Sequence, residues 1–151
     1  LILRTLSKSF SLAGARLGFV LGHPKVVREL LKVKDSYNVD RVTQALGRAA
    51  FSRAGIAAVR ANVRRIIRDR ERLTADLRRS GFSVPASRAN FVMAFAPAGV
   101  DAGGLYRALK KRGVLVRYFP HKRLKAGLRI TVGSRSENTR LLKELKRIRR
   151  S

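Results

Sequence analysis

Apolar residues recur along the chain at the spacings of strands and helices in alternation. Five short stretches rich in apolar residues predict strands, at 1–6, 17–21, 90–95, 114–119 and 128–132. In the last stretch Leu128 and Ile130 face one way, while Arg129 and Thr131 face the other. This strict alternation is typical of a strand with one buried face and one face open to a ligand or to solvent.

Apolar residues spaced three and four apart predict five helices, at 24–34, 42–51, 56–79, 101–112 and 135–150. Pro24 suits the first turn of the first helix, because its ring presets the helical φ angle. The longest helix carries apolar residues on one side and arginine on the rest, and Gly81 ends it. Ser134 and Glu137 have the spacing of a capping box at the start of the last helix.

The order of these elements predicts an α/β chain with two regions. Residues 1–55 form the first region, 56–80 a long connecting helix, and 81–151 a small α+β domain. We expect the three strands of the small domain to form a mainly antiparallel sheet, with its two helices on one face. Residue 1 is Leu and the only methionine is Met93, so we interpret the chain as the C-terminal part of a longer protein.

Composition excludes several kinds of site. The chain has 45% apolar and 29% charged residues, which is typical of a globular protein with a core. It has no cysteine and only two histidines, which excludes disulfides, thiol catalysis and a His-rich metal site. Its longest apolar run, 91–96, is far too short to cross a membrane, and no signal peptide opens the chain. These features predict a soluble cytoplasmic protein without a membrane partner.

The net charge of +26 raises the question of nucleic acid. The arginines are scattered over the whole chain, and acidic residues are interleaved even in the densest stretch, 60–79. No zinc-finger, basic-zipper or aromatic RNA-binding signature is present. We therefore interpret the charge as a solvated surface and expect no specific nucleic acid partner. A basic domain that binds polyanions remains an alternative.

The loop between the first two strands carries the most informative chemistry. Thr5 and Ser7 supply hydroxyls around Lys8, and Arg16 follows eight residues later, just before the second strand. Hydroxyls and a guanidinium fork suit phosphate oxygens. A lysine beside positive charge has a depressed pKa and becomes a nucleophile towards a carbonyl. These are the requirements of pyridoxal phosphate, although a surface loop with two solvated cations would also have this composition.

The amino-acid sequence of several stretches resembles the class I/II (fold type I) aminotransferases, and among them the histidinol-phosphate aminotransferases. Five motifs occur in the order of that family: TLSK with AGARLGF (5–8 and 13–19), YNV with Gln44 (37–39), SRANFV (87–92), VLVR (114–117) and LRITVGSRSEN (128–138). They extend over nearly the whole chain. The resemblance implies the C-terminal part of a fold type I transferase: the end of the large, cofactor-binding domain, an interdomain helix and the small domain.

The resemblance implies roles for the residues of the first loop. Lys8 matches the lysine that binds pyridoxal 5′-phosphate covalently and moves the proton of the substrate. Arg16 matches the arginine on the cofactor phosphate, and Thr5 and Ser7 match its hydroxyl partners. Together they would form the cofactor-binding group, with Lys8 as the catalytic residue.

The resemblance also implies a substrate group in the small domain. Arg129 matches the arginine that binds the carboxylate of glutamate or 2-oxoglutarate, and the phosphate of histidinol phosphate in the other half-reaction. Arg117 matches a further arginine near that phosphate, and Asn90 would line the substrate mouth. The implied partners are small amino and keto acids of histidine biosynthesis, and the complete protein would be a homodimer.

The family carries the rest of its site upstream of the lysine strand. That part holds an aspartate for the pyridine nitrogen, a stacking aromatic residue, and further Asn and Tyr groups, none of which this chain supplies. We therefore expect the chain to hold the lysine half of a site and not to turn over alone. An inactive fragment derived from an aminotransferase remains a further alternative.

Overall fold

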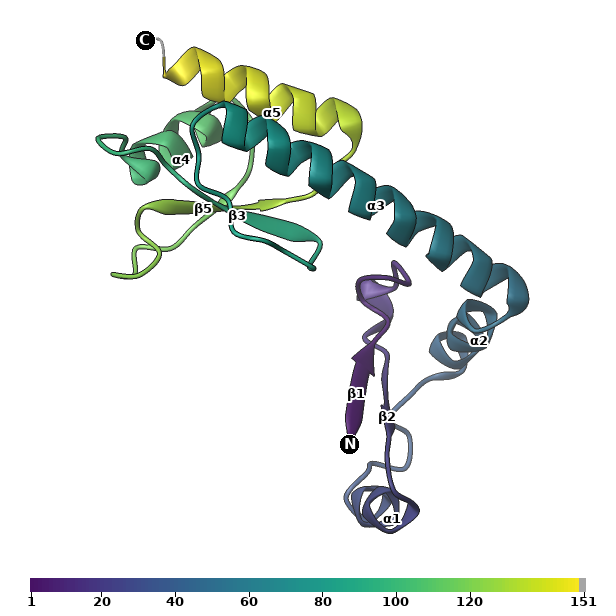
Figure 1. The fold of residues 1–151 in the computed structure, drawn as a ribbon. Helices are drawn as coiled ribbons and strands as arrows, with labels where there is room; N and C mark the ends of the chain where they lie inside the picture. The colour runs from purple at the N-terminus through teal and green to yellow at the C-terminus, as the bar shows by residue number, and fades with distance from the viewer. Residues whose placement is uncertain (150–151) are drawn as a thin grey trace. The chain divides into compact units, whose positions relative to one another are not determined.

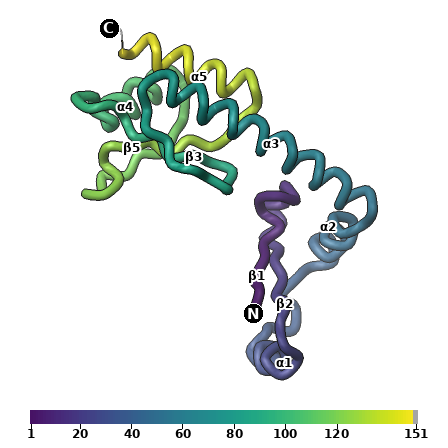
Figure 2. The backbone as a smooth tube through the Cα atoms, viewed as in Figure 1, coloured from purple at the N-terminus to yellow at the C-terminus, as the bar shows by residue number. Residues whose placement is uncertain are grey.

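A computed structural model of the chain describes residues 1–149. Contacts within the backbone divide the chain into two compact units, which we call unit 1 (Leu1–Val63) and unit 2 (Arg64–Ser151). Helix α3 (Arg53–Arg79) is continuous from the first unit into the second (Figures 1 and 2). Over the described residues, no helix is both long enough and apolar enough to cross a membrane.

Unit 1 begins with a β-hairpin. Strands β1 (Ile2–Thr5) and β2 (Gly18–Leu21) pair antiparallel, with Ile2 opposite Leu21 and Thr5 opposite Gly18. Between them lies a loop that contains a short 3₁₀ turn, η1 (Ala13–Ala15). Helices α1 (Pro24–Lys32) and α2 (Arg41–Ala50) follow. The two predicted strands and two predicted helices of this region are confirmed within a few residues.

Side chains cap the three helices that begin in unit 1. His23 Nδ1 accepts a hydrogen bond from the Lys25 amide (3.3 Å), and Asp40 Oδ1 accepts one from Thr43 (2.9 Å). Ser52 Oγ accepts one from the Gly55 amide at 3.1 Å. Because this serine satisfies an amide of the first turn, α3 begins at Arg53 and not at the predicted residue 56.

Unit 1 buries little of its apolar surface. Leu6 is its one fully buried large side chain among the described residues. Three phenylalanine rings form a cluster, with centroids 5.1 Å apart for Phe10 and Phe51 and 5.5 Å apart for Phe19 and Phe51. Many large apolar side chains of unit 1 are exposed: Leu1, Ile2, Leu3, Val20, Leu21, Val26, Leu30, Leu31, Val33, Tyr37, Val42 and Leu46.

Unit 2 contains a three-stranded antiparallel sheet in the order β3-β5-β4. Its strands are β3 (Phe91–Phe95), β4 (Arg117–Tyr118) and β5 (Gly127–Thr131). The central strand β5 pairs with β3 on one side and with β4 on the other. The predicted antiparallel sheet of the small domain is therefore confirmed.

One face of this sheet carries the core of unit 2. Helices α4 (Ala102–Lys111) and α5 (Arg135–Ile148) cover that face together with the end of α3 (Figure 1). The buried core residues come from all of these elements: Leu73, Leu77, Phe82, Val84, Val92, Ala94, Ala102, Leu105, Leu109, Leu128, Ile130, Val132, Leu141 and Leu145. Alternate positions of β3 and β5 thus point into the core, and the positions between them lie on the other face.

Strand β4 is much shorter than the strand predicted at 114–119. Gly113 has φ +69° and follows the end of α4, where its amide donates to the Lys110 carbonyl (3.0 Å). The Val114 amide donates to the Leu109 carbonyl at 3.0 Å, which closes the helix end. The backbone of Val114 therefore belongs to the helix cap, and pairing with β5 begins only at Arg117.

Side chains cap both α4 and α5, and the predicted capping box of α5 is confirmed. Asp101 accepts hydrogen bonds from the amides of Gly103 (2.9 Å) and Gly104 (2.8 Å). A Cβ atom at Gly104 would lie 2.9 Å from the Asp101 carboxylate, so glycine permits this close contact. At the start of α5, Ser134 and Glu137 form both hydrogen bonds of a capping box.

Candidate functional site

The loop between β1 and β2 is folded back on itself by hydrogen bonds. The Leu6 amide donates to the Leu17 carbonyl (3.0 Å), and the Leu12 amide donates to the Leu6 carbonyl (3.1 Å). Leu6 is buried beneath the loop, with 1% of its surface exposed. This buried leucine and its backbone bonds hold the start and the end of the loop together, so residues distant in sequence belong to one compact turn.

Thr5 and Ser7 form one polar group at the start of this loop. The Thr5 hydroxyl donates to Ser7 Oγ at 2.8 Å, and the Ser7 amide donates to Thr5 Oγ1 at 3.1 Å. This ST turn orients two hydroxyls directly before Lys8. Lys8 itself is exposed, and its carbonyl accepts a hydrogen bond from the Ser11 amide (3.0 Å).

Arg16 lies at the other end of the same loop. Its φ of 51° is in the left-handed region, which is uncommon for a residue with a side chain. Its Nη1 donates to the Ala13 carbonyl at 3.0 Å, so the loop itself holds the guanidinium. After it, Gly18 lies opposite Thr5, where a Cβ would be only 2.8 Å from the Arg4 carbonyl oxygen. The glycine of the motif therefore allows the hairpin to close directly behind Arg16.

A second group of predicted site residues lies on the open face of the sheet in unit 2. Arg129 on β5 and Arg117 on β4 are direct partners in the strand register, so their side chains lie on the same face. Arg129 is half-buried and Arg117 is exposed. Within residues 1–149 neither guanidinium forms a salt bridge with a carboxylate.

Two phenylalanine rings contact Arg129. Its Cζ atom lies 5.3 Å from the ring centroid of Phe91 and 5.4 Å from that of Phe119. Arg117 Cζ also lies 5.4 Å from the Phe119 ring. These are cation–π distances, and they leave the in-plane N–H groups of the guanidinium available to an anion.

Asn90 directly precedes β3 at the edge of the same sheet. Its carbonyl accepts a hydrogen bond from the Val132 amide at 2.9 Å, and the residue is half-buried. Of the predicted site residues, Thr5, Ser7, Lys8 and Arg16 thus share one loop of unit 1. Arg117 and Arg129 belong to one sheet of unit 2, and Asn90 adjoins its strand β3.

Neither of the two rings around Arg129 is among the site residues predicted from the sequence. Phe91 lies inside the SRANFV motif, directly after the predicted site residue Asn90, and this position could have indicated that it belongs to the substrate group. Phe119 carried no such signal, because its contact with Arg129 depends on the register between β4 and β5.

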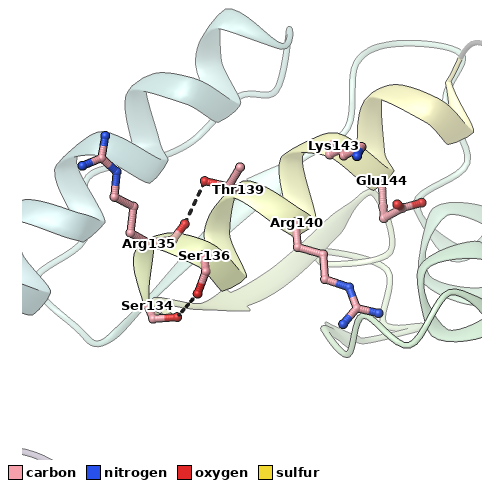
Figure 3. Close-up of a pocket in the computed structure, with 7 residues that line it drawn as sticks. All are labelled: Ser134, Arg135, Ser136, Thr139, Arg140, Lys143 and Glu144. Atoms are coloured by element: carbon pink, nitrogen blue, oxygen red, sulfur yellow. Dashed lines mark hydrogen bonds between the residues drawn. The ribbon is translucent and has the colours of Figure 1, made fainter.

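An open depression in unit 2 is lined by residues outside both groups (Figure 3). Its walls come from the first turns of α5: Ser134, Arg135, Ser136, Thr139, Arg140, Lys143 and Glu144. Several of its polar groups are already engaged by the chain. Thr139 Oγ1 donates to the Arg135 carbonyl (2.8 Å), and Ser134 Oγ caps α5 by accepting a hydrogen bond from the Glu137 amide. We therefore assign it no ligand.

Titration and metal chemistry do not mark a further site in residues 1–149. Hydrogen bonds from the side chain and amide of Thr43 lower the pKa of Asp40, and those from Ser134 lower the pKa of Glu137. Both carboxylates are helix caps on the surface. The described residues contain no cluster of three or more potential metal ligands.

The profile of the family described as "Aminotransferase class I and II" matches residues 1–145. The chain belongs to this family. It is 43% identical over 151 residues to the histidinol-phosphate aminotransferase of Syntrophus aciditrophicus. This match covers 98% of this chain and 41% of that protein. The chain thus spans about two fifths of the length of this curated relative.

Solved structures with the same fold agree with this assignment. The histidinol-phosphate aminotransferase of Sinorhizobium meliloti, in complex with pyridoxal-5′-phosphate, has a TM-score of 0.83 at 26% identity and covers 98% of this chain and 40% of its own. A decarboxylase from Sulfurospirillum multivorans has a TM-score of 0.87 at 27% identity, and the match covers 97% of this chain and 38% of the decarboxylase chain. The predicted family and α/β fold class are therefore confirmed.

Proposed function

We propose that this chain provides the lysine loop and the substrate arginines of a histidinol-phosphate aminotransferase. The observation that carries the proposal is the 43% identity to such an enzyme over a match that covers 98% of the chain, and so extends over the TLSK loop and the LRITVG strand. The reaction would transfer an amino group between histidinol phosphate and 2-oxoglutarate in the cytoplasm. The complete enzyme would be a homodimer, with the remaining site residues outside this chain.

The residues of the first loop fit pyridoxal phosphate by their chemistry. Thr5 and Ser7 are already hydrogen-bonded to each other and offer hydroxyls for phosphate oxygens. Arg16 is held by the Ala13 carbonyl through one nitrogen, which leaves its other N–H donors for the phosphate. When bound, the cofactor supplies the electron sink that makes the substrate Cα–H bond acidic.

Lys8 is the group of this chain that would move the proton. Its exposed amine follows the hydroxyl pair in the same loop, and its backbone is held by the Ser11 amide. A lysine amine can accept the proton from the substrate Cα and return it to a neighbouring carbon. Positioned acid–base groups of this kind contribute about 10²–10⁴-fold to a rate.

Arg129 and Arg117 would bind the anionic end of the substrate. A guanidinium offers paired N–H donors that match both carboxylate and phosphate, so one residue can serve both half-reactions. Two adjacent arginines without a carboxylate partner in the described chain give this face of the sheet a local excess of positive charge. Such a face favours a dianion such as a phosphate monoester.

The first experiment tests Lys8 in the chain as it stands. The chain is incubated with pyridoxal phosphate and reduced with borohydride, and the modified lysines are mapped by mass spectrometry. We expect Lys8 to be labelled above the other nine lysines, and Lys8→Ala to lose that label while Lys25→Ala keeps it. Equal labelling of all lysines would contradict the proposal and favour the alternative of a basic, non-enzymatic domain.

The second experiment tests the reaction. The chain is completed with the part of the Syntrophus aciditrophicus relative that it does not match, and amino transfer from histidinol phosphate to 2-oxoglutarate is measured. We expect turnover by the completed protein, none by the chain alone, and at least a ~100-fold loss in Lys8→Ala. Release of carbon dioxide from an amino acid phosphate, without amino transfer, would instead assign decarboxylase chemistry.

A further inference from the structure

Arg117 and Arg129 form an unfavourable pair on the open face of the sheet. They are directly opposite each other on neighbouring strands, where like charges destabilise a sheet. Over the described residues no carboxylate neutralises either of them. Something other than an acidic side chain must therefore hold the half-buried Arg129 guanidinium in place.

The two phenylalanine rings approach Arg129 from the two strands that flank β5. Phe91 belongs to β3 and Phe119 follows β4, and β5 lies between these strands. The register places Phe91 opposite Thr131, two residues after Arg129, so the ring is a diagonal neighbour on the same face. The guanidinium lies within 5.3–5.4 Å of both ring centroids.

The backbone on either side of this arrangement is itself constrained. Ser87 Oγ donates to the Phe91 carbonyl (2.7 Å) and accepts from the Ala89 amide (3.1 Å). Arg70 Nη1 donates to the Ala89 carbonyl (2.9 Å), which ties the turn to α3. After β4, Pro120 restricts the preceding residue Phe119 to extended backbone. Both rings are thus presented by ordered segments and not by free loops.

We propose that Phe91 and Phe119 are positioning residues that hold the Arg129 guanidinium between them and orient it for an anion. This rests on the proposed function in so far as the anion is the substrate. An aromatic face attracts the flat side of the guanidinium but does not use its in-plane N–H donors. A carboxylate partner would occupy those donors and compete with the substrate, so the rings provide order without competition.

The test uses nuclear magnetic resonance on the 151-residue chain. The Nε–Hε signal of Arg129 is assigned by its loss in Arg129→Lys, and its heteronuclear NOE and chemical shift are measured in variants. Phe91→Leu and Phe119→Leu each remove one ring, and Phe91→Tyr restores an aromatic face. Phe95→Leu is the matched control, because Phe95 shares the face and strand of Phe91 while its ring lies against Gly127.

We expect an ordered Arg129 side chain, with a ring-current shift, in the original chain and in Phe91→Tyr and Phe95→Leu. The two leucine variants at 91 and 119 should lose that shift and show a lower NOE. Titration with inorganic phosphate should give an apparent Kd about 2–5-fold weaker in each of them, as expected for the loss of one cation–π contact.

The outcomes separate this inference from the proposed function. An Arg129 signal that is mobile in the original chain, or unchanged by both leucine variants, overturns the positioning role. Loss of order in the two variants supports it, whatever phosphate does. If Arg129→Lys binds phosphate as well as the original chain does, the substrate role of Arg129 fails on its own.

Discussion

Ser134 and Glu137 show how two side chains define the beginning of a helix. The Ser134 amide donates to Glu137 Oε2 (2.7 Å), and the Glu137 amide donates to Ser134 Oγ (3.3 Å). The Ser134 hydroxyl also donates to Glu137 Oε2 at 2.7 Å. This last hydrogen bond and the one from the amide lower the pKa of Glu137 below its ordinary value.

The lowered pKa predicts how this cap depends on pH. A carboxylate with a lower pKa in the folded state stabilises the fold fully above its ordinary pKa of about 4.3. That stabilisation is lost as the pH falls through the folded value. We expect Ser134→Ala to raise the pKa of Glu137 and to weaken this acid dependence, measured by titrating the Glu137 carboxyl carbon and by urea unfolding at pH 7 and pH 3.

The same substitution removes an N-cap serine. At neutral pH it should lower the free energy of unfolding by about 1 kcal/mol. Ser136→Ala is the control, because Ser136 contacts the Ser134 hydroxyl but takes no part in the capping box. An equal loss of stability in both variants would contradict the role of the cap.

The candidate site shows what could be predicted for single residues. The place of Arg129 on the open face of its strand was predictable because that strand alternates, whereas its role towards a substrate stays a prediction. The capping box at Ser134 was predictable because its spacing is local. The contact of Phe119 with Arg129 was not, since it joins residues of two strands through a register that no short pattern encodes.

Among the elements, the helices that cover the sheet in unit 2 contribute half of its buried core residues. Leu109 of α4 has no exposed surface and lies among residues of β5 and α5 in one cluster. We expect Leu109→Ala to lower the free energy of unfolding by about 2–5 kcal/mol, because it leaves a cavity in close-packed surroundings. Urea denaturation followed by circular dichroism measures this loss.

Leu115 provides the matched control for that experiment. It lies six residues further along the chain, and 78% of its surface is exposed. Leu115→Ala should therefore change the free energy of unfolding by less than about 0.5 kcal/mol. A large effect there, or a negligible effect at Leu109, would contradict the assignment of the core.

The elements also show where patterns along the chain fail. Residues 114–119 predict a strand because they form a short run in which every residue except Arg117 is apolar or aromatic. In the structure Val114 and Val116 pack against the core, but the amide of Val114 completes the end of α4. A short apolar run predicts that a segment packs against the core, whereas the hydrogen-bond partner of each amide depends on the helix cap and on the neighbouring strand.

For the whole molecule, the positive charge is the property that no single element explains. The net charge of +26 is spread over arginines and lysines of both units, with few acidic residues among them. We expect retention on immobilised heparin at low salt, with an affinity that falls linearly on a log–log plot against salt concentration. Elution from a heparin column over a salt gradient measures this.

Paired substitutions distinguish a diffuse charge from a dedicated binding site. Arg140→Ala with Lys143→Ala removes two charges from α5, and Lys25→Ala with Arg28→Ala removes two from α1. Both pairs should lower the eluting salt concentration by similar amounts. If one pair alone abolished retention, a specific polyanion site would exist and the interpretation of the charge as a solvated surface would be wrong.

The uneven burial of α3 has a consequence for how the molecule opens. Leu73 and Leu77 near its end are buried, whereas Val63 and Ile67 are 36% and 37% exposed. Packing of its apolar face against the rest of the protein stabilises a helix more than its own hydrogen bonds do. Because this packing is uneven along α3, its backbone amides should exchange with deuterium at graded rates. We expect slow exchange around residues 70–79 and faster exchange towards Arg53, measured residue by residue. Uniform protection along the helix would mean that α3 opens in one cooperative event. A gradient would mean that it frays from its beginning while its end still holds unit 2 together.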